Sequence, residues 1–163
     1  MNTRDLTSSL STLLAELVDG APLGGGAYML NGGDRGLLRS LDQLSAKEAS
    51  ASSHGGATIG AHADHLRYGL SLMNRWSDGE RNPWADADWG IAWRRTTVTE
   101  GEWTALREML TDEAHRWLAG VRTPREVGEV ELNGIIGSIA HIAYHLGAIR
   151  QIEAGARGPK EVG

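Results

Sequence analysis

Apolar residues recur along the chain every three or four positions, the spacing that places side chains on one face of an α-helix. The first such stripe predicts an amphipathic helix over residues 3–19 and consists of Leu6, Leu10, Leu13 and Leu17. A second stripe, behind Asp34 as a cap, predicts a shorter helix near residues 34–45 and consists of Leu37, Leu38, Leu41 and Leu44. Residues 45–49 are expected to form one further helical turn.

Three longer helices are predicted in the rest of the chain. Thr58 is an N-cap residue for a helix over residues 59–77, whose inward stripe is Ile59, Ala63, Leu66, Leu70 and Met73. Thr99 opens a capping box, so a helix is expected over residues 99–119, with an inward face of Trp103, Leu106, Leu110 and Trp117. The most apolar stretch of the chain predicts a last helix over residues 132–154.

The segments between these helices are predicted to be loops. Residues 21–33 are glycine-rich but match neither a Walker A loop nor a dinucleotide-binding fingerprint, so they form either a lid over a site or a simple link. Residues 91–98 have a β-like composition without a confident strand. We therefore predict one all-α domain over residues 1–163, a four-helix bundle with an extra short N-terminal helical segment.

Composition narrows the functional classes. The chain has 163 residues and a net charge of −5, which argues against nucleic acid as a partner. It has no cysteine, so any metal site must be built from histidine and carboxylate side chains. No apolar stretch reaches the roughly 18 residues of a transmembrane helix. Because residues 1–18 also lack a signal-peptide pattern, a cytoplasmic location without a membrane partner is expected.

Tryptophan is used unusually. Phenylalanine is absent and there are six tryptophans, four of them in a short stretch: Trp76, Trp84, Trp89 and Trp93. Either these indoles take the place of other aromatic residues in the core, or they form a pocket wall or a subunit contact.

Three histidines share one relation to the predicted core. His65, His141 and His145 each precede a residue of an apolar stripe, so each is offset by about 100° from the middle of that stripe. If the two helices pack together, the three imidazoles converge at the edge of the core. Such a triad is a metal site with an open coordination position, and neutral imidazole suits Zn²⁺, Ni²⁺, Fe²⁺ or Cu²⁺.

Familiar metal motifs do not account for this spacing. The stretch HIAYH has Ile142 where a zincin carries its glutamate, and the chain contains no E-x-x-H motif of the di-iron type. His62, one turn before His65, is a further candidate for the site. His54 is expected to be solvated in its loop, and His115 to lie on the polar face of its helix.

The two histidine-bearing segments resemble the DinB-like superfamily of bacterial four-helix bundles. They are GATIGAHADHLRYGLSLMNRW, residues 56–76, and SIAHIAYHLGAIRQIE, residues 138–153. The second departs from the family pattern at Ala148, where glutamine is common. The resemblance implies a triad of His65, His141 and His145 that binds zinc, nickel or another divalent ion, and a homodimer in many members.

Activity in that superfamily is not uniform. Some members resemble thiol S-transferases that use mycothiol or bacillithiol, others are thiol-dependent isomerases, and many have no assigned chemistry. The expectation is therefore a metal-dependent enzyme of the thiol S-transferase or hydrolase type acting on a small molecule. Because the chain lacks cysteine, a low-molecular-weight thiol would be a co-substrate.

Two alternatives stay open. One is a non-catalytic helical bundle, a stress-linked dimer that binds a metal or small ligand. The other is a helical interaction protein whose histidines are ordinary core residues. For the enzyme, the candidates for steering a substrate are His62, Tyr68, Tyr144 and Arg150, although Tyr144 is equally compatible with an interface or core position. Asp64 is expected to face solvent.

Overall fold

Side-chain caps fix where the long helices of the chain begin. In the computed structural model, which describes residues 3–22 and 24–160, Thr58 accepts a hydrogen bond from the backbone N–H of Ala61 at the start of α4 (Ile59–Ser77). Thr99 and Glu102 form the predicted capping box at the start of α5 (Glu100–Arg122). Both predicted starts are confirmed, while α5 continues three residues beyond the predicted end at residue 119.

The described part of the chain is all-helical, with six α-helices and no strand. Besides α4 and α5 these are α1 (Thr3–Asp19), α2 (Gly36–Asp42), α3 (Ala46–Ala49) and α6 (Glu129–Ile152). Two 3₁₀ turns, η1 (Ala92–Arg94) and η2 (Ala154–Ala156), complete the order of elements. The β-like stretch before α5 therefore contains a helical turn, and the last helix lies two to three residues earlier than predicted.

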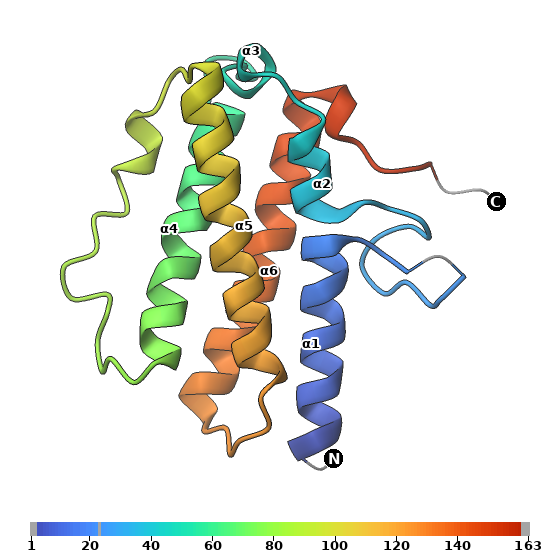
Figure 1. Ribbon diagram of the computed structural model, residues 1–163, viewed down its shortest axis with the longest axis vertical. Helices are drawn as coiled ribbons and strands as arrows, with labels where there is room; N and C mark the ends of the chain where they lie inside the picture. The colour runs from blue at the N-terminus through green and yellow to red at the C-terminus, as the bar shows by residue number, and fades with distance from the viewer. Residues whose placement is uncertain (1–2, 23, 161–163) are drawn as a thin grey trace.

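Four long helices lie side by side, and α2 packs beside the C-terminal ends of α1 and α6 (Figure 1). The predicted inward residues of α5 are all buried: Trp103, Leu106, Leu110 and Trp117. The stripe on α1 is wider than predicted because that helix contacts both α5 and α6. Leu14 and Val18 are fully buried there, whereas Leu6 and Leu13 are only partly buried.

Helix α6 is long and apolar enough, by length and composition alone, to cross a membrane. Five of its apolar side chains form an inward, buried row in this structure: Ile135, Ile139, Ile142, Leu146 and Ile149. A central helix that packs against neighbours meets the same criterion, because its contacts with other helices also favour apolar residues.

The glycine-rich segment is a link and not a lid. The carboxylate of Glu16, only 2% exposed, accepts hydrogen bonds from the backbone N–H groups of Tyr28, Met29 and Leu30 at 2.6–3.1 Å. These bonds hold the segment beside α1 and α2, on the side of the molecule away from α4 (Figure 1). Leu23 lies outside the described residues.

Arg150, a candidate for steering a substrate, is engaged in hydrogen bonds within the protein. Its guanidinium donates to a carboxylate oxygen of Asp34 at 2.7 Å and to the backbone carbonyl of Ala156 at 3.1 Å. Asp34 also accepts from the N–H of Gly36 at the start of α2. The arginine thus joins the end of α6 to Asp34, in the segment before α2, and to Ala156 in η2, and both of these partners are buried.

We predict that Glu16→Gln lowers the free energy of unfolding by about 2 kcal/mol, because a neutral amide with one acceptor oxygen replaces a buried carboxylate that serves three donors. Urea unfolding measures the change, with Glu108→Gln on the exposed face of α5 as the matched control. A loss equal to that of the control would show that these hydrogen bonds do not hold the segment.

Candidate metal centre

Three histidine side chains from two helices meet at one point. The Nε2 atom of His141 on α6 lies 3.0 Å from Nε2 of His65 on α4 and 2.9 Å from Nε2 of His145 on α6. The three possible ligand atoms all lie within 4.8 Å of one another. His65 is 8% exposed and His145 3% exposed, so the group lies at the edge of the core. The predicted convergence is confirmed.

The packing of α4 on α6 brings these rings together. Leu66, Ile142 and Leu146, which follow the three histidines in the sequence, are all buried in the same core. Since each histidine precedes its core neighbour by one residue, each ring lies on the same side of the helix contact. The apolar residues thus set the positions of the polar ones.

This donor set fits a divalent cation. Two imidazole nitrogens approach the single lone pair of His141 Nε2, and that lone pair cannot satisfy two N–H donors well. A divalent cation accepts lone pairs from all three imidazoles at once, which hydrogen bonds among the three nitrogens cannot do. Within the described ranges, the candidate ligand group contains three histidines and no carboxylate.

His62 lies beside the triad but outside it. Its Nδ1 atom is 2.8 Å from Nδ1 of His145. If His145 binds a metal through Nε2, its proton sits on Nδ1 and is donated to His62. This bond fixes the tautomer and the ring orientation that ligation needs. The Nδ1 atom of His65, by contrast, is buried without a hydrogen-bond partner in the described structure.

Burial keeps the four imidazoles neutral. Desolvation, followed by the neighbouring imidazoles, lowers the pKa of His145 to about 3. Desolvation and then His141 lower the pKa of His65 to about 4. Desolvation also lowers the pKa of His62 and of His141. A metal ligand must be the neutral imidazole, so the rings are in the required form at neutral pH.

Tryptophans cover the triad. Residues 78–99, which we call the covering loop, run from α4 to α5 and place Trp93 on His65, with ring centroids 4.5 Å apart and nearly parallel planes. Trp93 also meets His62 edge-on, and Trp89 lies 5.9 Å from His65. Trp89 and Trp93 are exposed, and Trp76 and Trp84 are partly buried. The pocket-wall interpretation is confirmed for Trp84 and Trp89, which line the hollow described next.

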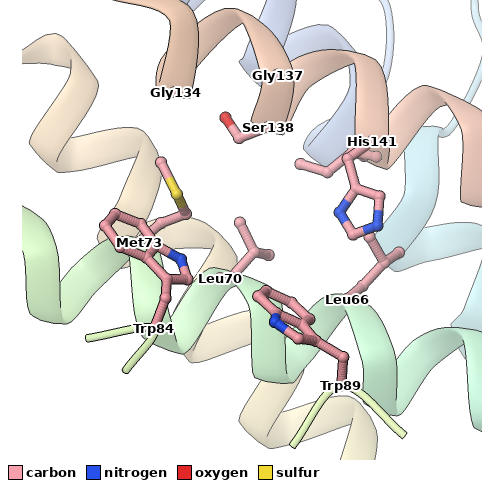
Figure 2. Close-up of a pocket in the computed structure, with 11 residues that line it drawn as sticks. Leu66, Leu70, Met73, Trp84, Trp89, Gly134, Gly137, Ser138 and His141 are labelled. Atoms are coloured by element: carbon pink, nitrogen blue, oxygen red, sulfur yellow. The ribbon is translucent and has the colours of Figure 1, made fainter. Parts of the chain in front are cut away.

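A hollow of about 190 Å³ adjoins the triad, between α4, α6 and the covering loop. Figure 2 shows the rings of Trp84 and Trp89 and the thioether of Met73 at its wall, with His141 at one end. The hydroxyl of Ser138, also in the wall, donates to the carbonyl of Ile135 and accepts from the indole N–H of Trp117. The lining is therefore mainly apolar.

The two tyrosines that are candidates for steering a substrate differ in their contacts and exposure. The hydroxyl of Tyr68 accepts a hydrogen bond from the backbone N–H of Asp88, and its ring contacts Trp89 edge-on, so it supports the covering loop. Tyr144 is 71% exposed, and its ring lies 5.0 Å from that of His145. Neither belongs to the metal-ligand group.

Asp64 does not face solvent, contrary to expectation. Its carboxylate is buried and accepts hydrogen bonds from Nε of Arg67 at 2.8 Å and Nε of Arg95 at 3.0 Å. Arg95 comes from the covering loop, which packs on α4 at η1. The sequence held a signal for the cover, the tryptophan density, but none for this ion pair.

The remaining histidines lie away from the triad, as predicted. His54 is exposed in its loop and contacts the hydroxyl of Ser53. His115 on α5 is exposed and its Nε2 atom lies 2.7 Å from a carboxylate oxygen of Asp19.

Comparison of the chain with protein-family models, with curated proteins and with solved structures found no match. The functional argument therefore depends on the geometry of the site.

We predict that the metal-free protein loses stability as pH falls below about 6.5. Below that pH the histidines of the unfolded chain take up protons. In the folded protein, His65 and His145 stay neutral until the pH approaches their lowered pKa values of about 4 and about 3. Each such proton lowers the free energy of unfolding by about 1.4 kcal/mol per pH unit. Urea unfolding between pH 7.5 and 5 measures the slope, which His145→Gln should reduce. Equal slopes in the two proteins would contradict the prediction.

We predict that His62→Ala weakens metal affinity by about 10- to 100-fold without changing stoichiometry, because His145 loses the partner of its outer nitrogen. Competition with a chelator gives the affinity. His62→Phe is the matched variant, since it keeps a ring against Trp93 but has no nitrogen. Wild-type affinity in His62→Phe would mean that His62 acts through packing alone.

Proposed function

We propose that this chain is a metal-dependent four-helix bundle of the DinB-like type, with zinc, nickel or iron bound by His65, His141 and His145. The convergence of three Nε2 atoms between α4 and α6 carries the proposal. The four long, adjacent helices and the spacing of the histidine segments support the bundle type.

The ligand set also favours a reaction class. Three neutral imidazoles leave the whole charge of a divalent ion uncompensated, so an anion is favoured at an open coordination position. A metal bound there would lower the pKa of a coordinated thiol or water, which yields a nucleophile at neutral pH. We therefore propose a thiol S-transferase or hydrolase type of enzyme, with a low-molecular-weight thiol as the co-substrate of the transferase.

The protein side chains supply position and shielding. Trp93 and Trp89 cover the triad and limit the access of water. His62 orients His145, and the hollow beside His141 offers room for a second molecule. The carboxylate of Asp64 is held by two arginines, so it does not act as the general base.

A non-catalytic metal- or ligand-binding bundle is the second candidate. Its support is the ligand group itself, which has no carboxylate within the described residues to take a proton during turnover. Product formation from low-molecular-weight thiols and a panel of electrophiles separates the two candidates. Stabilisation by ligand without product favours the binder.

We also propose a cytoplasmic homodimer. Val130, Ile136 and Tyr144 expose apolar surface along α6, which is the kind of surface that a second copy could cover. Sedimentation of the untagged protein tests the oligomeric state.

We predict that untagged protein carries about one divalent ion per chain and that alanine at any member of the triad removes it, because two remaining imidazoles cannot hold the ion. The variants are His65→Ala, His141→Ala and His145→Ala; His54→Ala and His115→Ala are controls at exposed histidines. Elemental analysis gives the metal content, and circular dichroism checks helicity. Normal metal content in a triad variant would refute the assignment.

A further inference from the structure

The hollow beside His141 has room for one small ring. Its volume is about 190 Å³, and an apolar protein cavity of roughly 150 Å³ is enough to take up benzene. A single aromatic ring with a short substituent therefore matches the available space, whereas a fused polycyclic or long-chain molecule would extend beyond it.

The walls favour an aromatic ring over a polar group of the same size. None of the described residues that line the hollow carries a formal charge at neutral pH. The hydroxyl of Ser138 already has a donor and an acceptor within the protein. The hydroxyl of Ser138 is thus not free to bind a polar ligand group, whereas a flat ring can stack on or meet the edges of the indoles of Trp84 and Trp89 (Figure 2).

The hollow adjoins the candidate metal centre through one shared residue, His141. His141 lines it, and the Nε2 atom of the same ring is the one that both other triad nitrogens approach. Trp89 likewise lines the hollow and lies 5.9 Å from the ring of His65. A ring bound in the hollow is therefore next to the triad, and its substituent needs to span only a short distance to it.

We propose that this hollow binds the single aromatic ring of a small substrate and points the ring's reactive substituent at the triad. The inference rests on the proposed function and names the class of molecule that the metal centre would act on. Leu66 and Ile142, buried between the hollow and the core, make the inner wall rigid, while the covering loop supplies the outer wall.

Two glycines on α6 allow a matched test. A Cβ atom at either Gly137 or Gly147 would meet nothing within 4 Å, so a side chain can start at both positions without a clash at its Cβ. Gly137 lines the hollow and Gly147 does not. Gly137→Leu should fill the hollow, and Gly147→Leu should change the same helix equally while leaving the hollow open. Both substitutions replace a poor helix former by a good one.

Toluene is the probe, because it has the ring and no metal-binding atom. Its affinity for the full-length protein is measured from the indole N–H resonances of the tryptophans. We expect toluene to bind the wild type and Gly147→Leu with affinities within about twofold, and Gly137→Leu at least about tenfold more weakly. Absence of binding to the wild type, or equal weakening in both variants, overturns the proposal. If Gly137→Leu does not fold, Gly137→Ala replaces it, with a smaller loss in the same direction.

Failure of the pocket and failure of the metal centre give different results. Toluene should bind His65→Ala as it binds the wild type, because His65 is not part of the wall. In Co²⁺-loaded wild type, bound toluene protons should relax faster than in Zn²⁺-loaded protein, and equal relaxation would overturn the adjacency to the triad. Toluene binding in a protein that takes up no metal would refute the proposed function and leave the pocket. Metal uptake without toluene binding would refute the aromatic-ring pocket and leave the proposed metal site.

Discussion

Desolvation of four imidazoles between α4 and α6 is the constraint on which the site depends. Partial burial disfavours the charged form of each ring and lowers its pKa, so the ring nitrogens remain free to act as ligands. This holds for His62, His65, His141 and His145. A free carboxylate beside these rings would oppose this effect by attracting a proton to them. Asp64, next to His65 in the chain, is paired with Arg67 and Arg95, and its charge raises the pKa of His65 by less than desolvation and the neighbouring imidazoles lower it.

The opposite side of the molecule is held by two other buried acids. Glu16 accepts hydrogen bonds from the backbone of the glycine-rich link. Asp34 pairs with Arg150, which lies five residues after His145 on α6. Helix α6 is therefore fixed from both sides, by α4 at the triad and by the segment before α2 at its C-terminal end. A helix held in this way gives His141 and His145 little freedom to move away from His65 on α4. A metal site with one open position requires such preorganisation of its ligands.

Much of this arrangement follows from local patterns in the sequence. Thr58 and Thr99 mark helix starts because a side-chain cap needs only its own next few residues, and the histidine convergence follows from a shared offset to Leu66, Ile142 and Leu146. The bond between His62 and His145 and the pairing of Asp64 with Arg95 join positions far apart in the chain, and no spacing rule encodes them. The pairing of Arg150 with Asp34 could not be predicted for the same reason, because Asp34 precedes Arg150 by more than a hundred residues.

The stacking of Trp93 on His65 has a consequence for spectroscopy. The indole of Trp93 lies 4.5 Å from the ring of His65, a candidate ligand, and the indole of Trp89 lies 5.9 Å from it, so both would be near a metal held by the triad. Paramagnetic ions such as Ni²⁺, Co²⁺ and Cu²⁺ quench excited states at such short range, whereas closed-shell Zn²⁺ does not. If the triad holds a metal, tryptophan emission would therefore distinguish between these ions without any added label.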